Sequence, residues 1–156
     1  FYLYIYYMNI NYFMNEAIKE AKYAFDNNEV PVGGILVDNK TNAIIGKSYN
    51  KVNQEKNAIY HCELDLIYNS CRNLSLKYLN NITMFVTLEP CLMCAAAISE
   101  VHIDKLYFGA YDEKNGGIEK FKFALKKNHA FKTDIYGGIM ENDCKNLLEK
   151  YFKKLR

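Results

Sequence analysis

Two short segments constrain this chain more than any other feature of its sequence: His61-Cys62-Glu63 and Pro90-Cys91-Leu92-Met93-Cys94. Pro90 suits the first turn of a helix, so the two cysteines should lie on one face near the start of that helix. A helix N-terminus stabilises thiolates, the form of cysteine that binds zinc. With His61 as the available third ligand, the two segments predict a zinc site.

A zinc ion with three protein ligands keeps its fourth position for water, which is typical of catalytic rather than structural sites. Such an ion lowers the pKa of the water to near neutrality, and Glu63 beside it would move the protons. Residues two apart on a regular helix point in nearly opposite directions. His61 and Glu63 can therefore serve one site only if it lies over the end of their helix, so two helix N-termini must converge on the metal.

Each part of this pattern also has a simpler interpretation. A Cys-x-x-Cys pair can be a redox pair or half of a structural zinc site, and a glutamate at a helix start is favoured by the helix dipole alone. A closed structural site would take Cys62 or Cys71 as its fourth ligand. The combination of both segments favours the catalytic interpretation.

The composition agrees with one domain in a reducing compartment. A chain of 156 residues is long enough to bury a core. Its five cysteines are an odd number, and no secretory signal is apparent, so we expect free thiols. The apolar segment 1–8 is far shorter than a membrane span, so no membrane association is expected. The net charge of +2 neither indicates nor excludes binding to nucleic acid.

Helix and strand patterns alternate along the chain. Apolar residues at helical spacing predict helices over 13–25, 64–74, 91–101 and 147–155. Short β-rich runs predict strands over 35–37, 43–46, 83–88 and 105–110, with a weaker one over 133–139. This interleaving predicts a layered α/β fold with a single domain over residues 12–156. Residues 1–11 are interpreted as an N-terminal extension, which we expect to be poorly ordered.

The two metal segments resemble the signature of the zinc-dependent nucleobase deaminases, the cytidine and deoxycytidylate deaminase superfamily. Four further segments resemble the tRNA adenosine deaminases within it: Glu29–Gly33, Thr87–Ile98, Phe108–Gly117 and Leu147–Lys153. The resemblance implies a three-layer αβα fold with a central mixed sheet of about five strands flanked by helices. It also implies zinc-dependent hydrolysis of adenosine to inosine at the wobble position of the tRNA anticodon.

The same resemblance assigns roles to single residues. Glu63 becomes the catalytic proton carrier, and Zn2+ becomes the cofactor held by the histidine and the two cysteines. Asn50, Val32 and the backbone at Cys62 become substrate contacts, although an asparagine at position 50 is also an ordinary turn residue. Cys62 departs from the small alanine common at this position in the family, and its thiol could compete as a zinc ligand.

A tRNA anticodon arm is the partner that the resemblance implies. Lys126-Lys127 and Lys153–Arg156 are candidate phosphate contacts, and Tyr151 or Phe152 is a candidate platform for stacking on a base. The alternative for these residues is ordinary solvated surface or core. A tRNA enzyme is expected in the cytoplasm, and the nucleus is an alternative location if the source is eukaryotic.

The oligomeric state and the substrate each keep alternatives. Asn50–Ala58 and Cys94–Ala97 look like the catalytic subunit of the eukaryotic heterodimeric tRNA deaminase. The chain is therefore expected to form a homodimer or a heterodimer with a related non-catalytic subunit. One rival function is deamination of a free base or nucleoside of the guanine or cytosine type. The other is a non-catalytic, zinc-stabilised subunit that positions a partner.

Overall fold

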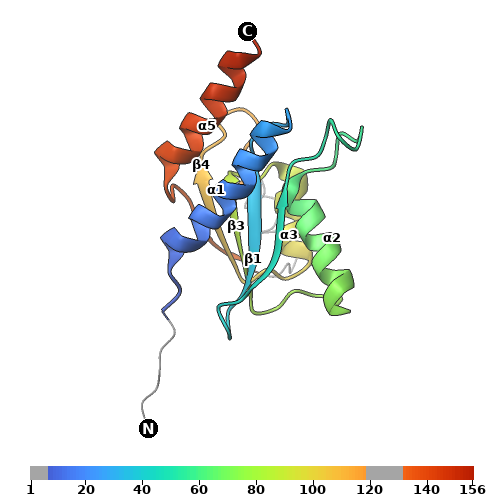
Figure 1. The fold of residues 1–156 in the computed structure, drawn as a ribbon. Helices are drawn as coiled ribbons and strands as arrows, with labels where there is room; N and C mark the ends of the chain where they lie inside the picture. Colours follow the sequence, from blue (N-terminus) through green and yellow to red (C-terminus); the bar gives the residue numbers. More distant parts are fainter. Residues whose placement is uncertain (1–6, 119–131) are drawn as a thin grey trace.

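The computed structural model describes residues 7–118 and 132–156, and Figure 1 shows their arrangement. Helices and strands alternate as the sequence pattern predicted. In chain order they are α1 (Ile10–Asp26), β1 (Gly33–Asp38), β2 (Ile44–Tyr49), α2 (Cys62–Leu74), β3 (Ile82–Leu88), α3 (Leu92–Glu100), β4 (Lys105–Ala110), β5 (Asp134–Tyr136) and α5 (Glu141–Lys154).

The first helix begins before the expected domain boundary. The side chain of Asn9 accepts a hydrogen bond from the Tyr12 backbone N–H, which is the usual way an asparagine caps a helix N-terminus. Residues 10 and 11, which we assigned to the extension, are therefore part of α1. Residues 1–6 lie outside the described residues.

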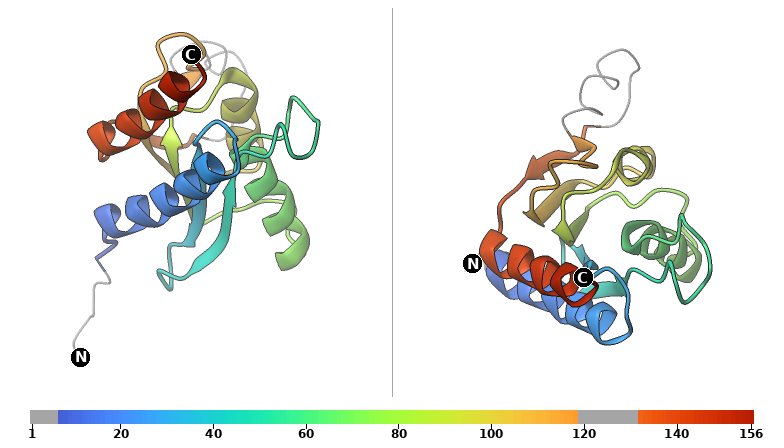
Figure 2. Two further views of the ribbon diagram at one scale, coloured as in Figure 1. Left: turned by 45° about the horizontal axis from the view of Figure 1, so that its top comes forward. Right: turned by 90° about the horizontal axis from the view of Figure 1, so that it is seen from above.

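Among the described residues, five strands form one mixed sheet in the order β2-β1-β3-β4-β5. β1 is antiparallel to both β2 and β3, whereas β3, β4 and β5 run parallel to one another. α1 and α5 cover one face of the sheet, and α2 and α3 cover the other (Figure 2). This is the three-layer αβα architecture that the resemblance implied.

Each face of the sheet has its own apolar core. Met84 and Val86 of β3 pack in the core beneath α2 and α3, and Phe85 packs in the core beneath α1 and α5. All three side chains are fully buried. Alternate residues of a strand point to opposite faces, so a central strand covered on both sides is apolar over most of its length.

Two contacts of Gly33, at the start of β1, help to place the segment that contains Cys91 and Cys94. A Cβ on Gly33 would lie 2.2 Å from the backbone nitrogen of Ala21, so only glycine lets α1 pack this closely on β1. The Gly33 N–H donates to the Thr87 hydroxyl at 3.1 Å, which ties the start of β1 to the end of β3. β3 then leads directly into Pro90 and α3.

Among the described residues, no helix has the length and apolar character that crossing a bilayer requires.

Candidate metal centre

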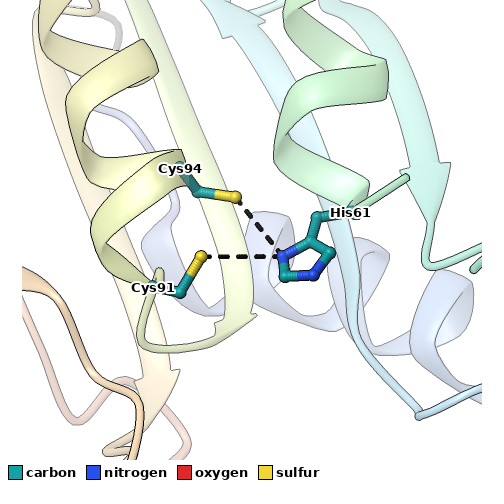
Figure 3. A group of neighbouring side chains, drawn as sticks. All are labelled: His61, Cys91 and Cys94. Atoms are coloured by element: carbon teal, nitrogen blue, oxygen red, sulfur yellow. Dashed lines mark hydrogen bonds between the residues drawn. The ribbon is translucent and has the colours of Figure 1, made fainter. Parts of the chain in front are cut away.

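The two helix N-termini that the sequence required to converge do lie together. His61 is the N-cap residue of α2, and Cys91 is the N-cap residue of α3. Figure 3 shows their side chains and that of Cys94 pointing into the space between the helices. The Nδ1 atom of His61 lies 3.7 Å from Cys91 Sγ and 3.5 Å from Cys94 Sγ.

These distances fit a zinc ion. Bonds of about 2.3 Å to sulfur and about 2.0 Å to nitrogen, at tetrahedral angles, place the ligand atoms about 3.5 Å apart. The ligand atoms of His61, Cys91 and Cys94 all lie within 4.8 Å of one another, and the described residues contain no other such group. One imidazole and two thiols suit zinc, and three protein ligands are the number typical of a catalytic site.

The three side chains are close enough to change one another's pKa. Hydrogen bonds with Cys94 and His61 lower the pKa of the Cys91 thiol to about 4, so this sulfur is a thiolate at neutral pH. The hydrogen bond with Cys91 raises the pKa of His61, and the hydrogen bond with Cys91 also raises the pKa of Cys94. Ligands must lose their protons to bind a metal, so zinc would replace the protons that hold this cluster together.

Glu63 lies in the first turn of α2 and is only 4% exposed. Burial raises the pKa of its carboxyl, and the charge of His61 and a hydrogen bond with Cys94 oppose this rise. A buried carboxyl with a raised pKa beside a metal centre has the properties of a proton carrier.

The three predicted substrate contacts lie against one another beside this centre. The Asn50 side-chain oxygen accepts the Cys62 backbone N–H at 2.9 Å, and the Asn50 backbone N–H donates to the Val32 carbonyl at 3.0 Å. The structure thus brings Asn50, Val32 and Cys62 together at the start of α2. Their contact with a substrate stays a prediction.

The Cys62 thiol is not a member of the metal group. Its sulfur donates a hydrogen bond to the Ser48 carbonyl at 3.3 Å, and burial raises its pKa well above the ordinary value. A neutral, fully buried thiol with its own partner is a poor competitor for zinc. Neither Cys62 nor Cys71 belongs to the metal group, so among the described residues the group has three ligands and no fourth.

The segment after β4 forms hydrogen bonds with Glu89 and Pro90, the two residues that precede Cys91. The Asp112 backbone N–H donates to Glu89 Oε2 at 3.1 Å, and the Gly117 N–H donates to the Pro90 carbonyl at 2.8 Å. A Cβ on Gly117 would lie 2.2 Å from the Leu92 backbone nitrogen, so a side chain does not fit there. Part of the Phe108–Gly117 segment therefore fixes the position of residues 89–92, which include the metal ligand Cys91.

The predicted RNA-contact residues fall into different environments. Tyr151 is 6% exposed and its hydroxyl donates to the Asn28 carbonyl, whereas Phe152 is 48% exposed. Of this pair, Phe152 is the side chain accessible for stacking. The segment Lys153–Arg156 is exposed at the end of the chain, and Lys126-Lys127 lies outside the described residues.

The sequence analysis missed a buried polar cluster beside Asn50. Asp65 is 6% exposed and forms an ion pair with Lys51 at 2.8 Å. An aspartate in the first turn of a helix is ordinarily explained by the helix dipole. No pattern in the sequence distinguished Asp65 from such a residue, because its partners come from a different strand and loop.

Comparison with known proteins agrees with this centre. Residues 8–110 match the family defined as the cytidine and deoxycytidylate deaminase zinc-binding region. The chain is 43% identical over 144 residues to a tRNA-specific adenosine deaminase of Rickettsia bellii, an alignment that covers 92% of this chain and 99% of the relative. It is 40% identical over 152 residues to one of Aquifex aeolicus, covering 96% of this chain and 97% of the relative.

Solved structures give the same result for the fold. A structure from work on A-to-I editing by tRNA:A34 deaminases superposes with a TM-score of 0.81 at 36% identity, covering 87% of this chain and 98% of the other. The guanine deaminase from Nitrosomonas europaea superposes with a TM-score of 0.78 at 15% identity, covering 90% and 83%. An identity of 15% shows the fold alone.

The fold and the histidine–cysteine centre define a zinc-dependent deaminase, a hydrolase whose cofactor is Zn2+. The chain belongs to the cytidine and deoxycytidylate deaminase zinc-binding family.

Proposed function

We propose that this chain converts adenosine to inosine at the wobble position of a tRNA anticodon. One observation carries the proposal. The complete centre of His61, Cys91 and Cys94, with buried Glu63 beside it, lies in a chain that matches 99% of a tRNA-specific adenosine deaminase of Rickettsia bellii at 43% identity.

In this proposal His61, Cys91 and Cys94 hold the zinc ion. When bound, zinc supplies an activated water for attack on the ring carbon that bears the amine. Glu63 takes a proton from the attacking water and delivers protons to the ring nitrogen and the leaving amine. Adenosine and water thereby give inosine and ammonia. Glu63 is only 4% exposed, so its carboxyl has little contact with bulk water.

Asn50, Val32 and the Cys62 backbone would border the target nucleoside. The Asn50 side-chain oxygen already accepts the Cys62 N–H, so the amide nitrogen is the group left to donate to the substrate. The exposed Phe152 and the basic end of α5 would contact the rest of the anticodon arm.

The two rival functions have weaker support. The likeness to guanine deaminase from Nitrosomonas europaea is at 15% identity and supports the fold rather than a free-base substrate. A non-catalytic subunit has no need of a buried glutamate beside its metal ligands, and Glu63 occupies that place.

The first prediction concerns the substrate. The purified chain should form inosine in an adenosine-containing anticodon stem-loop, detected by nucleoside mass spectrometry, because unpaired loop bases are the ones a protein can extract and read. Free adenosine, cytidine and guanine should release little ammonia under the same conditions. Ammonia from the free compounds without inosine in the stem-loop would refute the tRNA proposal.

We further propose that the chain acts as a dimer, paired with itself or with a related non-catalytic chain. Several large apolar side chains on α2 and α3 are exposed, namely Tyr68, Leu74 and Leu92. These side chains are the candidates for contact with the second chain.

Sedimentation of the purified chain tests the pairing. A homodimer should sediment at twice the chain mass of 18.2 kDa. A chain that needs a different partner should sediment at 18.2 kDa and be inactive alone. A fully active monomer would contradict both forms of the proposal.

With tRNA as substrate we expect the chain to act in the cytoplasm, or in the nucleus of a eukaryotic cell. Fractionation of cells that express a tagged chain would check this.

A further inference from the structure

We propose that Asp65 and Lys51 form a partly buried ion pair that positions the Asn50 carboxamide for the target nucleoside. The inference rests on the proposed function, because it assigns these two residues a part in holding the same adenosine. Both are positioning residues, since they act through Asn50 rather than on the substrate.

Asp65 holds the chain on both sides of Asn50. Its Oδ2 atom accepts the Ser48 hydroxyl at 2.5 Å and the Lys51 ammonium at 2.8 Å. Its Oδ1 atom accepts the Asn69 amide at 2.8 Å, which fixes the carboxylate against the next turn of α2. One carboxylate on a helix therefore restrains Ser48 near the end of β2 and Lys51, the residue that follows Asn50 in the loop.

The same cluster holds the far end of that loop, next to His61. The Lys51 backbone N–H donates to the Tyr60 carbonyl at 3.2 Å, and the Asp65 N–H donates to the His61 carbonyl at 3.1 Å. The Lys51 ammonium also lies 5.0 Å from the ring centre of Tyr49 and 5.9 Å from that of Tyr60. The negative charge of Asp65 raises the pKa of Tyr60, which keeps that phenol neutral.

Asn50 itself cannot reorient while Ser48 and Lys51, on either side of it, stay in place. It is 8% exposed, its backbone N–H is used by the Val32 carbonyl, and its side-chain oxygen is used by the Cys62 N–H at 2.9 Å. The amide oxygen is thus committed to the protein, so the amide nitrogen is presented to the substrate. A shift of Ser48 or Lys51 would move this donor, and hydrogen bonds weaken steeply with misalignment.

Both members of the pair stay charged near neutral pH. Burial alone would raise the pKa of Asp65, but hydrogen bonds from Lys51 and Ser48 lower it. Burial likewise opposes a charged Lys51, but the hydrogen bond with Asp65 raises the pKa of its ammonium. The lysine side chain is 20% exposed and that of the aspartate 4%. Lys51 is therefore committed to Asp65 and is not a free phosphate contact.

Stability alone does not explain such a pair. Replacing both members of a buried ion pair with apolar residues is often neutral or stabilising, whereas removing one member leaves an uncompensated charge. This asymmetry separates the two roles experimentally. A purely structural pair can be replaced by Lys51→Met with Asp65→Leu at no cost to binding, whereas a positioning pair cannot.

The test measures binding by fluorescence anisotropy in the Glu63→Gln background, which does not consume the substrate. Two stem-loops are compared, one with the target adenosine and one abasic at that position. Asp65→Leu alone should lower the melting temperature, and the double variant Lys51→Met/Asp65→Leu should recover it. The double variant should nevertheless bind the adenosine stem-loop about tenfold more weakly, as expected for one misplaced hydrogen bond. Its affinity for the abasic stem-loop should not change.

Two further variants make the result specific. Glu16 and Lys47 form another ion pair, at 2.6 Å, on the α1 side of the sheet. The matched control Lys47→Met/Glu16→Leu should leave both affinities unchanged. Ser48→Ala, which removes one hydrogen bond to Asp65, should weaken only the adenosine stem-loop and by a smaller factor, even if the double variant does not fold.

Three results would overturn the inference. The first two are a double variant that binds both stem-loops as before, and one that binds both more weakly by the same factor. The third is a Glu63→Gln chain, without the double substitution, that binds the adenosine and abasic stem-loops equally. The proposed function fails separately, if the wild-type chain forms no inosine in the stem-loop. A wild-type chain that forms inosine, with a double variant that binds normally, leaves the function intact and removes the positioning role.

Discussion

Glu63→Gln is expected to slow inosine formation by about 10²- to 10⁴-fold, the range that positioned general acid–base groups contribute. Glutamine has nearly the same shape but carries no transferable carboxyl proton. Because Glu63 is not a member of the metal group, the zinc content should not change. Single-turnover assays with an excess of enzyme over stem-loop give the rate, and elemental analysis of the same preparation gives the metal.

The matched control is Glu100→Gln, at the far end of α3, where the side chain is exposed. It should leave both the rate and the zinc content unchanged. A fully active Glu63→Gln variant would show that another group carries the proton. A variant that loses its zinc would show instead that Glu63 supports the metal, and its slow rate would then say nothing about proton transfer.

Cys94→Ser is expected to abolish both zinc binding and deamination. The sulfur of Cys94 is buried and lies 3.5 Å from His61 Nδ1, inside the group that fits zinc. A serine hydroxyl is far less acidic than a thiol, so it does not provide the anionic ligand that the metal requires. Zinc stoichiometry and inosine formation, measured on one preparation, check this expectation.

Cys71→Ser is the control for a cysteine substitution, because Cys71 is a partly buried cysteine of α2 outside the metal group. It should retain zinc and activity. Chelation of the wild-type chain should reproduce the Cys94→Ser phenotype, and added zinc should reverse it only in the wild type. Normal zinc content in the Cys94→Ser protein would show that the metal is held by other residues.

The metal centre was predictable because its ligands lie in two short segments whose local structure follows from their spacing. The position of Pro90 fixes where α3 begins, and helical spacing then places Cys91 and Cys94 on one side. The demand that His61 and Glu63 serve one site gave the further prediction that two helix N-termini meet. The structure confirms this arrangement, with His61 and Cys91 as the two N-cap residues.

The fold was predictable in outline but not in its pairing. The periodicity located the helices and strands, yet it contains nothing that places β1 between β2 and β3 or makes β1 antiparallel to β3. The start of α1 was placed too late, although Asn9 is a common capping residue and could have marked it.

The polar cluster around Asp65 was not predictable. Its members are spread over β2, the following loop and α2, and each looks like an ordinary surface residue in the sequence. The orientation of Cys62 is a similar case, because whether its thiol points to the metal or to the Ser48 carbonyl depends on the packing of α2 against β2. Such details follow from tertiary contacts rather than from spacing.

The central claim is that a zinc ion on His61, Cys91 and Cys94 serves an adenosine deaminase acting on RNA. The most direct test is to strip the purified chain of metal, add zinc in steps, and measure inosine in an anticodon stem-loop at each step. We predict that inosine formation rises in proportion to bound zinc and reaches its maximum when the single predicted site is full. Inosine formation that is independent of bound zinc, or a zinc-loaded chain that forms no inosine, would contradict the account.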